Sequence, residues 1–225
     1  MTTASIAETD QALEVFMPVG SVVLAGELIV PAKAAGVVLF AHGSGSSRHS
    51  PRNQFVARLI REAKVGTLLF DLLTAEEEAV DAHSGHLRFD IPFLARRLVG
   101  ATEWLSAHEQ TRNLAVGYFG ASTGGGAALV AAAEIGERVG AVVSRGGRPD
   151  LAGAALPFVT APTLLIVGGR DYPVIEMNRE ALAQLRCEKR LEIIPGATHL
   201  FEEPGTLEEV ARLAADWFVA HFAVN

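Results

Sequence analysis

The chain has 225 residues, 49% of them hydrophobic and 20% charged, a composition typical of globular proteins and unlike that of disordered or fibrous ones. Its formal net charge of −7 argues against a nucleic-acid partner or an anionic membrane surface, because both attract clustered Lys and Arg. The length suits one α/β domain. We therefore expect a polar N-terminal tail over residues 1–11 and a single domain over residues 12–225.

The N-terminal segment has neither the basic start nor the apolar stretch of a secretory signal, which predicts a cytoplasmic location. Residues 114–133 carry no charge, but their five glycines make a membrane-spanning helix unfavourable, so we expect no membrane partner. The single cysteine, Cys187, cannot form an internal disulfide, which fits a reducing compartment.

Two opening segments and a series of short apolar runs follow each other along the chain. Residues 13–17 and 22–30, separated by Pro18 and Gly20, predict an antiparallel hairpin. The apolar runs, typical of strands buried on both faces, are residues 36–41, 66–70, 114–119, 141–143 and 163–167. Residues 190–194 are a further strand candidate. The amphipathic segments between them, which predict helices, are residues 54–63, 91–107, 125–135, 174–186 and 206–222. Residues 74–90 fit neither pattern and are expected to form a surface excursion.

This alternation predicts an α/β fold with a mostly parallel central sheet and helices on both of its faces. No insertion is long enough to form a large cap domain. Ligands of such sheets bind at the carboxyl ends of the strands. The segments that directly follow each strand are therefore the places to look for chemistry.

The segment after residues 114–119 reads Gly120-Ala121-Ser122-Thr123-Gly124, a G-x-S-x-G motif between a predicted strand and a predicted helix. Glycines on both sides of the serine allow the close backbone approach that a sharp turn needs. Ser122 is therefore the candidate nucleophile. The same glycines also match the phosphate-binding turn of short-chain dehydrogenases, but that turn follows the first strand of its sheet, and no Tyr-x-x-x-Lys is present.

A serine hydroxyl needs a base and an orienting carboxylate, and both should follow later strands. Asp171 follows residues 163–167, and His199 follows residues 190–194. The order Ser122, Asp171, His199 is the one expected for this arrangement. Asp150, which follows residues 141–143, is the competing acid, although its setting resembles a helix cap.

An oxyanion hole needs backbone N–H groups where negative charge develops. His42-Gly43-Ser44-Gly45 follows the strand at residues 36–41 and has the form of a loop that supplies such a group. We expect the amides of Ser44 and Thr123 to be the donors. The side chain of His42 lies at the same edge and is expected to hold the loop in shape or to contact substrate.

With these motifs in place, the chain looks like an α/β-hydrolase and resembles the dienelactone hydrolase family. The resemblance rests on HGSGSSRHSPRN at 42–53, GASTGG at 120–125, GGRD at 168–171 and GATHLF at 196–201. It implies a compact α/β-hydrolase fold, no cofactor, and a small-molecule substrate. Characterised dienelactone hydrolases use a cysteine nucleophile, whereas this chain has Ser122. The expected substrate is therefore a carboxylic ester, a lactone or a thioester.

Four arginines follow strands at the same predicted edge, namely Arg48, Arg52, Arg145 and Arg148. They could bind an anionic substrate through charge-assisted hydrogen bonds, or they could pair with Asp150 and Glu side chains or face water. His83 and His86 lack the partners of a metal site, so no metal is expected.

Two other functions fit the same motifs. An acyltransferase could use the same triad, and a non-catalytic protein of this fold could bind a small ligand. A non-catalytic protein commonly lacks a triad member, whereas all three positions are filled here.

Overall fold

The computed structural model describes residues 11–222. The expected tail over residues 1–11 therefore lies almost entirely outside the described residues, and so do the last three positions of the expected domain.

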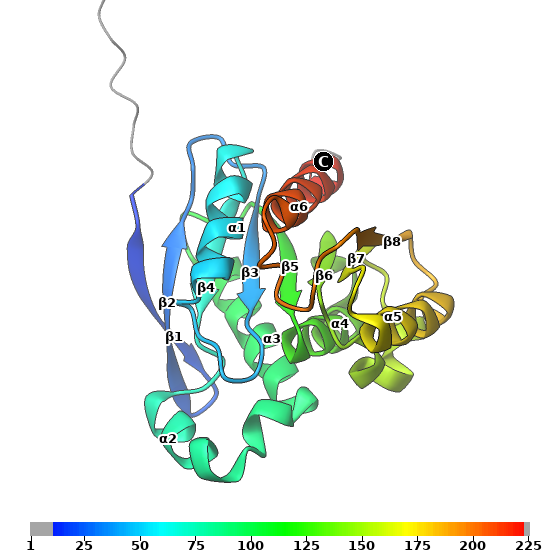
Figure 1. Ribbon diagram of the computed structural model, residues 1–225. Coiled ribbons are helices and arrows are strands. Elements are labelled where there is room, and N and C mark those ends of the chain that lie inside the picture. Colours follow the sequence, from blue (N-terminus) through cyan, green and yellow to red (C-terminus); the bar gives the residue numbers. More distant parts are fainter. Residues whose placement is uncertain (1–10, 223–225) are drawn as a thin grey trace, which may run out of the picture.

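One eight-stranded sheet runs through the described chain, in the order β1-β2-β4-β3-β5-β6-β7-β8 (Figure 1). Strands β1 and β2 form the predicted antiparallel hairpin, β2 pairs antiparallel with β4, and every other neighbouring pair is parallel. The prediction of a mostly parallel α/β sheet with an opening hairpin is confirmed. The strands are β1 Leu13–Val19, β2 Val22–Ile29, β3 Gly36–Ala41, β4 Gly66–Phe70, β5 Ala115–Ala121, β6 Ala141–Arg145, β7 Thr163–Gly168 and β8 Lys189–Ile194.

Helices cover both faces of this sheet, as the alternating pattern predicts. Side chains of β3 show why: Val37 and Leu39 pack into the core that contains α3, α4 and α5, whereas Val38 and Phe40 pack into the core that contains α1 and α6. Alternate residues of a buried strand point to opposite faces, so an unbroken apolar run fills two cores. The helices are α1 Pro51–Glu62, α2 Ala75–Ser84, α3 Ile91–Ala107, α4 Thr123–Ile135, α5 Tyr172–Gln184 and α6 Thr206–Phe222.

The expectation that residues 74–90 form no regular element is wrong. They contain α2 and a short 3-10 helix, Leu87–Phe89. Thr74 Oγ1 accepts a hydrogen bond from Glu77 N, and the Glu77 side chain accepts one from Thr74 N, while Gly85 ends the helix with φ of +67°. Thr74-x-x-Glu77 followed by Gly85 is a helix start and stop signal that an apolar-periodicity search misses, because the helix is mostly polar and buries only Asp81 among its residues.

Other differences lie at element ends. Helix α1 begins at Pro51 instead of residue 54, with Ser50 as its N-cap. A further 3-10 segment, Pro149–Phe158, follows β6. No large cap covers the sheet, and no helix within residues 11–222 is long and apolar enough to cross a membrane.

The chain reverses its direction of travel through the sheet between β3 and β5. From β3 it adds β4 on one side, and then it returns to add β5 on the other side of β3. Connections diverge from the carboxyl ends of two such strands and leave a crevice there. His42 follows β3 and Ser122 follows β5, so both predicted loops lie at this crevice.

Candidate active site

Ser122 occupies a sharp turn between β5 and α4. Its φ of +51° and ψ of −122° lie in a backbone region that residues other than glycine rarely adopt. Such a backbone costs of order 1–3 kcal/mol and persists only when its surroundings hold it. Here the Ser122 N–H donates to Arg145 O at 3.4 Å, and Ser122 O accepts from Gly125 N and Arg148 N, each at 3.0 Å. The loop after β6 therefore holds the turn from both sides.

The glycines of the motif are required by close contact between backbones. A Cβ added to Gly120 would lie 2.5 Å from Gly124 O, and a Cβ added to Gly124 would lie 2.1 Å from Ala41 O. Any side chain at these positions would push the turn away from β3 and from the start of α4.

Asp171 and His199 meet at the ends of two neighbouring strands. His199 Nδ1 lies 2.6 Å from Asp171 Oδ2, and the Asp171 side chain is 13% exposed. The loops that carry them are joined by backbone hydrogen bonds, from Gly169 N to Ile194 O and from Arg170 N to Ala197 O. Because Asp171 holds Nδ1, the nitrogen that His199 presents to other partners is Nε2.

Ser122 and His199 line one pocket of about 240 Å³. Residues from the loop after β3, the start of α1, the turn after β5 and the loops after β6 and β8 all contribute to it. Its lining consists of Gly43, Ser44, Ser46, Ser50, Arg52, Ala121, Ser122, Arg145, Gly146, His199 and Leu200. Within residues 11–222, the structure thus brings the predicted nucleophile and base to the same pocket, with the predicted acid bonded to the base.

The loop after β3 lies directly against the serine. A Cβ on Gly43 would lie 3.1 Å from both Ser122 Cβ and Ala121 O. Thr123 is the first residue of α4, so its N–H has no carbonyl one turn earlier in that helix to bond. The Ser44 N–H, by contrast, donates to Thr123 Oγ1 at 3.0 Å. One of the two expected oxyanion donors is therefore engaged by a side chain in this structure.

His42 holds the same loop. Its Nε2 accepts a hydrogen bond from Leu72 N at 3.1 Å, so its Nδ1, 3.0 Å from Gly43 O, carries the proton and donates. Burial lowers the pKa of His42, although the bond to Gly43 opposes this effect. The buried, neutral ring fits the expected structural role of His42. The ring lines a separate pocket under α2, together with Leu72 and Leu73.

The four arginines divide into two pairs. Arg52 and Arg145 line the pocket of Ser122, whereas Arg48 lines another pocket with Glu14 and Glu27. Arg48 Nη1 bonds Asp71 Oδ2 at 2.5 Å, and Arg148 makes two hydrogen bonds to Asp150, at 2.8 and 2.7 Å. The expectation that all four share one rim therefore differs from the structure, because Arg48 and Arg148 bind carboxylates and do not line the pocket of Ser122. Arg52, which does line it, makes only a 3.5 Å contact to Glu202.

Those contacts also bear on the alternatives. Asp150 is engaged by Arg148, whereas Asp171 contacts His199. Cys187 is half-buried beside Thr163, with Sγ 3.8 Å from Thr163 Oγ1, and is not part of the pocket lining. Among residues 11–222, no cluster of three His, Cys, Asp or Glu side chains could hold a metal ion.

Sequence reasoning missed Ser46 and Ser50, which line the pocket, and Asn53, whose Oδ1 lies 3.4 Å from Arg145 Nη2. Ser50 and Asn53 lie at the start of α1, which the apolar pattern placed at residue 54. Ser50 followed by Pro51 is an N-cap and first-turn signal that would have moved the helix start to the pocket.

The profile of the dienelactone hydrolase family matches residues 61–222. The chain is 64% identical to a dienelactone hydrolase from Anabaena variabilis ATCC 29413, whose structure superposes with a TM-score of 0.93 over 94% of this chain and 98% of that one. The chain belongs to the dienelactone hydrolase family. Est1E from Butyrivibrio proteoclasticus, 16% identical, shares the fold with a TM-score of 0.75, over 93% of this chain and 99% of that one.

Membership of the dienelactone hydrolase family relates this chain to hydrolases. Its curated relatives, from two strains of Mycobacterium tuberculosis, carry the provisional name of a phosphoribosyl transferase. Each is 60% identical over 208 residues, which is 92% of this chain and 46% of the relative. The chain thus spans about half the length of those proteins, and their name describes a longer molecule.

Proposed function

We propose that the chain is a serine hydrolase that cleaves a carboxylic ester, a lactone or a thioester through an acyl-enzyme on Ser122. The observation that carries this proposal is the 2.6 Å contact between His199 and Asp171, in a pocket that His199 shares with a serine at a strained strand-to-helix turn. A nucleophile, a base and an orienting carboxylate in this relation form the machinery of acyl transfer.

In the proposed reaction His199 Nε2 takes the proton of Ser122 Oγ as the oxygen attacks the substrate carbonyl carbon. Asp171 keeps Nδ1 protonated and stabilises the imidazolium that forms. His199 then gives the proton to the leaving oxygen or sulfur, which departs from the acyl-enzyme. A water molecule, deprotonated by His199, then attacks the acyl-enzyme, and His199 returns this proton to Ser122 Oγ as the acid leaves.

The negative charge on the carbonyl oxygen needs donors beside Ser122. The Thr123 N–H at the start of α4 is the proposed first donor, and the N-terminal end of that helix adds partial positive charge. The Ser44 N–H is the proposed second donor, which requires it to exchange Thr123 Oγ1 for the substrate oxygen.

The transferase name of the curated relatives does not describe the pocket found here. It belongs to proteins of which this chain matches less than half. The arrangement of Ser122, His199 and Asp171 supports hydrolysis of an acyl compound instead, with no cofactor proposed.

A fluorophosphonate probe tests the proposal directly, because it labels serines activated by a base. Intact-protein mass spectrometry should show one adduct on the wild-type chain and none on Ser122→Ala. Cys187→Ser is the matched control and should keep both the adduct and ester hydrolysis. An adduct that persists in Ser122→Ala would show that another residue reacts, and loss of activity in a folded Cys187→Ser protein would move the nucleophile to the cysteine.

A further inference from the structure

Arg145, the last residue of β6, is a buried cation for which hydrolysis alone gives no reason. Its side chain is 7% exposed, and its Nε and Nη1 atoms have no hydrogen-bond partner among the described residues. Its third nitrogen, Nη2, makes only a long contact of 3.4 Å to Asn53 Oδ1. Burial and the neighbouring Arg52 lower the pKa of Arg145 to about 10, so the group still carries its charge at neutral pH. Proteins rarely bury a charge without an anion to balance it.

The pocket that Arg145 lines collects further positive charge. Arg52 lines it from the first turn of α1, and the 12-residue α1 begins at Pro51 with no acidic residue in its first turn. Helix N-termini carry partial positive charge and favour anions. None of the lining residues is Asp or Glu, although the whole chain has a net charge of −7. Positive charge is therefore concentrated at this pocket, against the balance of the molecule.

Hydroxyl donors add to the charge. Ser44, Ser46 and Ser50 line the same pocket, and Ser50 is the N-cap of α1. Two guanidinium groups, three hydroxyls and a helix N-terminus together offer more donors than the two oxygens of a carboxylate can use. They match the three terminal oxygens and two negative charges of a phosphate monoester, which guanidinium groups bind in paired hydrogen bonds.

We propose that this pocket binds a phosphate monoester group, held between Arg145, Arg52 and the N-terminal end of α1. Because the same pocket contains Ser122 and His199, the phosphate and the scissile acyl group belong to one small molecule. This phosphate site names a substrate class for the proposed hydrolysis, a phosphate-bearing ester or thioester. The site itself is argued from Arg145 and Arg52, and only the reaction rests on the proposed function.

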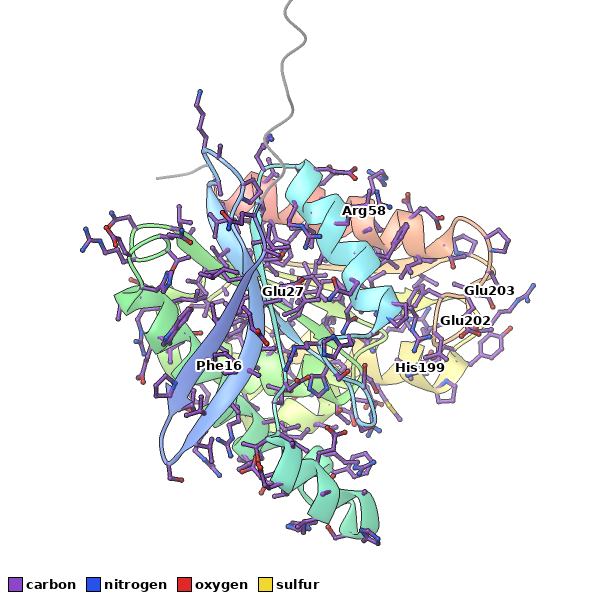
Figure 2. All side chains as sticks on the ribbon, turned by 90° about the vertical axis from the view of Figure 1, so that its left-hand side faces the viewer. Phe16, Glu27, Arg58, His199, Glu202 and Glu203 are labelled. Carbon is purple, nitrogen blue, oxygen red and sulfur yellow. The ribbon has the colours of Figure 1, made fainter. Side chains whose placement is uncertain are left out.

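Glu202 competes with such a ligand for Arg52. Its Oε1 lies 3.5 Å from Arg52 Nη1, and its side chain is 65% exposed. Figure 2 shows Glu202 on the same side of the molecule as His199, with Arg58 farther along α1. A phosphate that reaches Arg52 therefore replaces a weak, solvent-exposed ion pair. Removal of the Glu202 charge should tighten binding of the anion.

The test is calorimetric titration of the Ser122→Ala protein with ethyl phosphate at pH 8, where this probe is a dianion. Ethyl sulfate has the same shape with one charge, and propionate supplies a carboxylate. We expect ethyl phosphate to bind about tenfold or more tightly than either of them. Arg145→Met and Arg52→Gln should each raise its dissociation constant by about tenfold. Glu202→Gln should lower that constant by about two- to threefold.

Arg58→Gln is the matched control, because Arg58 lies on the same helix and pairs with Glu62 in solvent. It should leave the dissociation constant unchanged. Circular dichroism checks that each variant is folded. Because the Arg52 side chain is 37% exposed, Arg52→Gln should fold, and it keeps the test valid if Arg145→Met does not fold. Binding of ethyl phosphate to the Ser122→Ala protein is measured without catalysis. Failure of the hydrolase proposal and failure of the phosphate site therefore give separate results.

Three results would overturn the proposal. Propionate binding as tightly as ethyl phosphate would make the pocket a carboxylate site. Absence of saturable binding would remove the site altogether. An equal loss of affinity in Arg58→Gln and in the two pocket variants would show that ethyl phosphate binds by general charge rather than at Arg145 and Arg52.

Discussion

Ser122 combines a strained backbone with the proposed nucleophile. Its φ of +51° suits glycine, yet a hydroxyl stands at this position. The carbonyl of Arg145 and the amide of Arg148 hold the strained turn in place. Stability is thereby lost at the residue on which the proposed chemistry depends.

The strain predicts different stabilities for two variants that lack the proposed nucleophile. Ser122→Gly removes the steric conflict, whereas Ser122→Ala keeps a Cβ in the same conformation. We expect Ser122→Gly to be about 1 kcal/mol more stable than Ser122→Ala, as measured by urea unfolding. Equal stability of the two variants would mean that the turn relaxes without cost.

Asp171 is the acid that the structure places against His199, and its loss should be specific. Asp171→Asn should lower kcat by about three to four orders of magnitude, because the amide no longer holds the histidine in the productive tautomer. Asp150→Asn is the control and should keep kcat within about threefold, since it breaks only a partly exposed pair with Arg148. A larger loss in Asp150→Asn, with both circular dichroism spectra unchanged, would transfer the acid role.

His42, in the loop after β3, should make the stability of the protein depend on pH. Because burial lowers its pKa in the folded state, the unfolded chain takes up the proton first as the pH falls. The contribution of His42 to stability is therefore complete above its unfolded pKa of about 6.5 and is lost as the pH falls toward the lower folded value. Protonation of Nε2 would also break the bond from Leu72 N.

We expect the free energy of unfolding of the wild-type chain to fall more between pH 7.5 and 5.5 than that of His42→Gln. Glutamine can still accept a hydrogen bond but does not titrate. Denaturant titrations of both proteins at the two pH values give the difference. An equal fall in both would exclude His42 as the source.

At the scale of elements, α2 shows how polar signals can define a helix without an apolar stripe. Its capping box and Gly85 mark both ends. Asp81, whose side chain is fully buried, accepts hydrogen bonds from Leu87 N and from Arg88, and this joins α2 to the segment after it. Helix α2 lies beside the loop after β3, since Glu78 and Asp81 line the same small pocket as His42 and Ser44.

Loss of the cap should loosen this helix alone. Thr74→Ala removes the acceptor of the Glu77 N–H and costs about 1 kcal/mol of helix stability. Hydrogen exchange of the α2 amides should therefore become about fivefold faster, while amides of β3 and β5 keep their protection. Thr74→Ser retains the hydroxyl and should exchange like the wild type. Exchange unchanged in Thr74→Ala would show that tertiary contacts alone hold α2.

At the scale of the whole molecule, no large cap covers the sheet within residues 11–222, and this limits the apolar wall that a substrate can meet. The pocket of Ser122 has about 240 Å³ and is lined mostly by polar residues, and the apolar pocket under α2 holds about 20 Å³. Neither provides an extended apolar wall for a long acyl chain. Each additional methylene that did find burial would add about 0.8 kcal/mol of binding.

Among neutral p-nitrophenyl esters with two to sixteen acyl carbons, we therefore expect kcat/KM to be highest from acetyl to butyryl. Ser122→Ala supplies the background rate for each ester. A maximum at twelve or more carbons would show that the molecule provides an apolar channel absent from this structure.

Much of this architecture follows from local sequence. Unbroken apolar runs predicted the five strands β3 to β7 because burial on both faces leaves no room for a polar alternation, and residues 91–107 and 206–222 match α3 and α6. Ser122, Asp171 and His199 stand out because each follows a strand, and the carboxyl ends of parallel strands meet at one edge. The apolar pattern did not predict helix α2, because capping residues rather than apolar periodicity mark its ends.

Side-chain partners were decided only by the tertiary structure. Four arginines follow strands or precede helices in similar ways, yet Arg48 and Arg148 meet carboxylates while Arg145 is buried beside Arg52 with no acidic partner in the described chain. The engagement of the Ser44 amide by Thr123 Oγ1 likewise joins residues 79 positions apart. Sequence spacing determines which edge of the sheet a residue reaches. The contacts it makes there depend on the packing of segments that are distant in sequence, which no local pattern encodes.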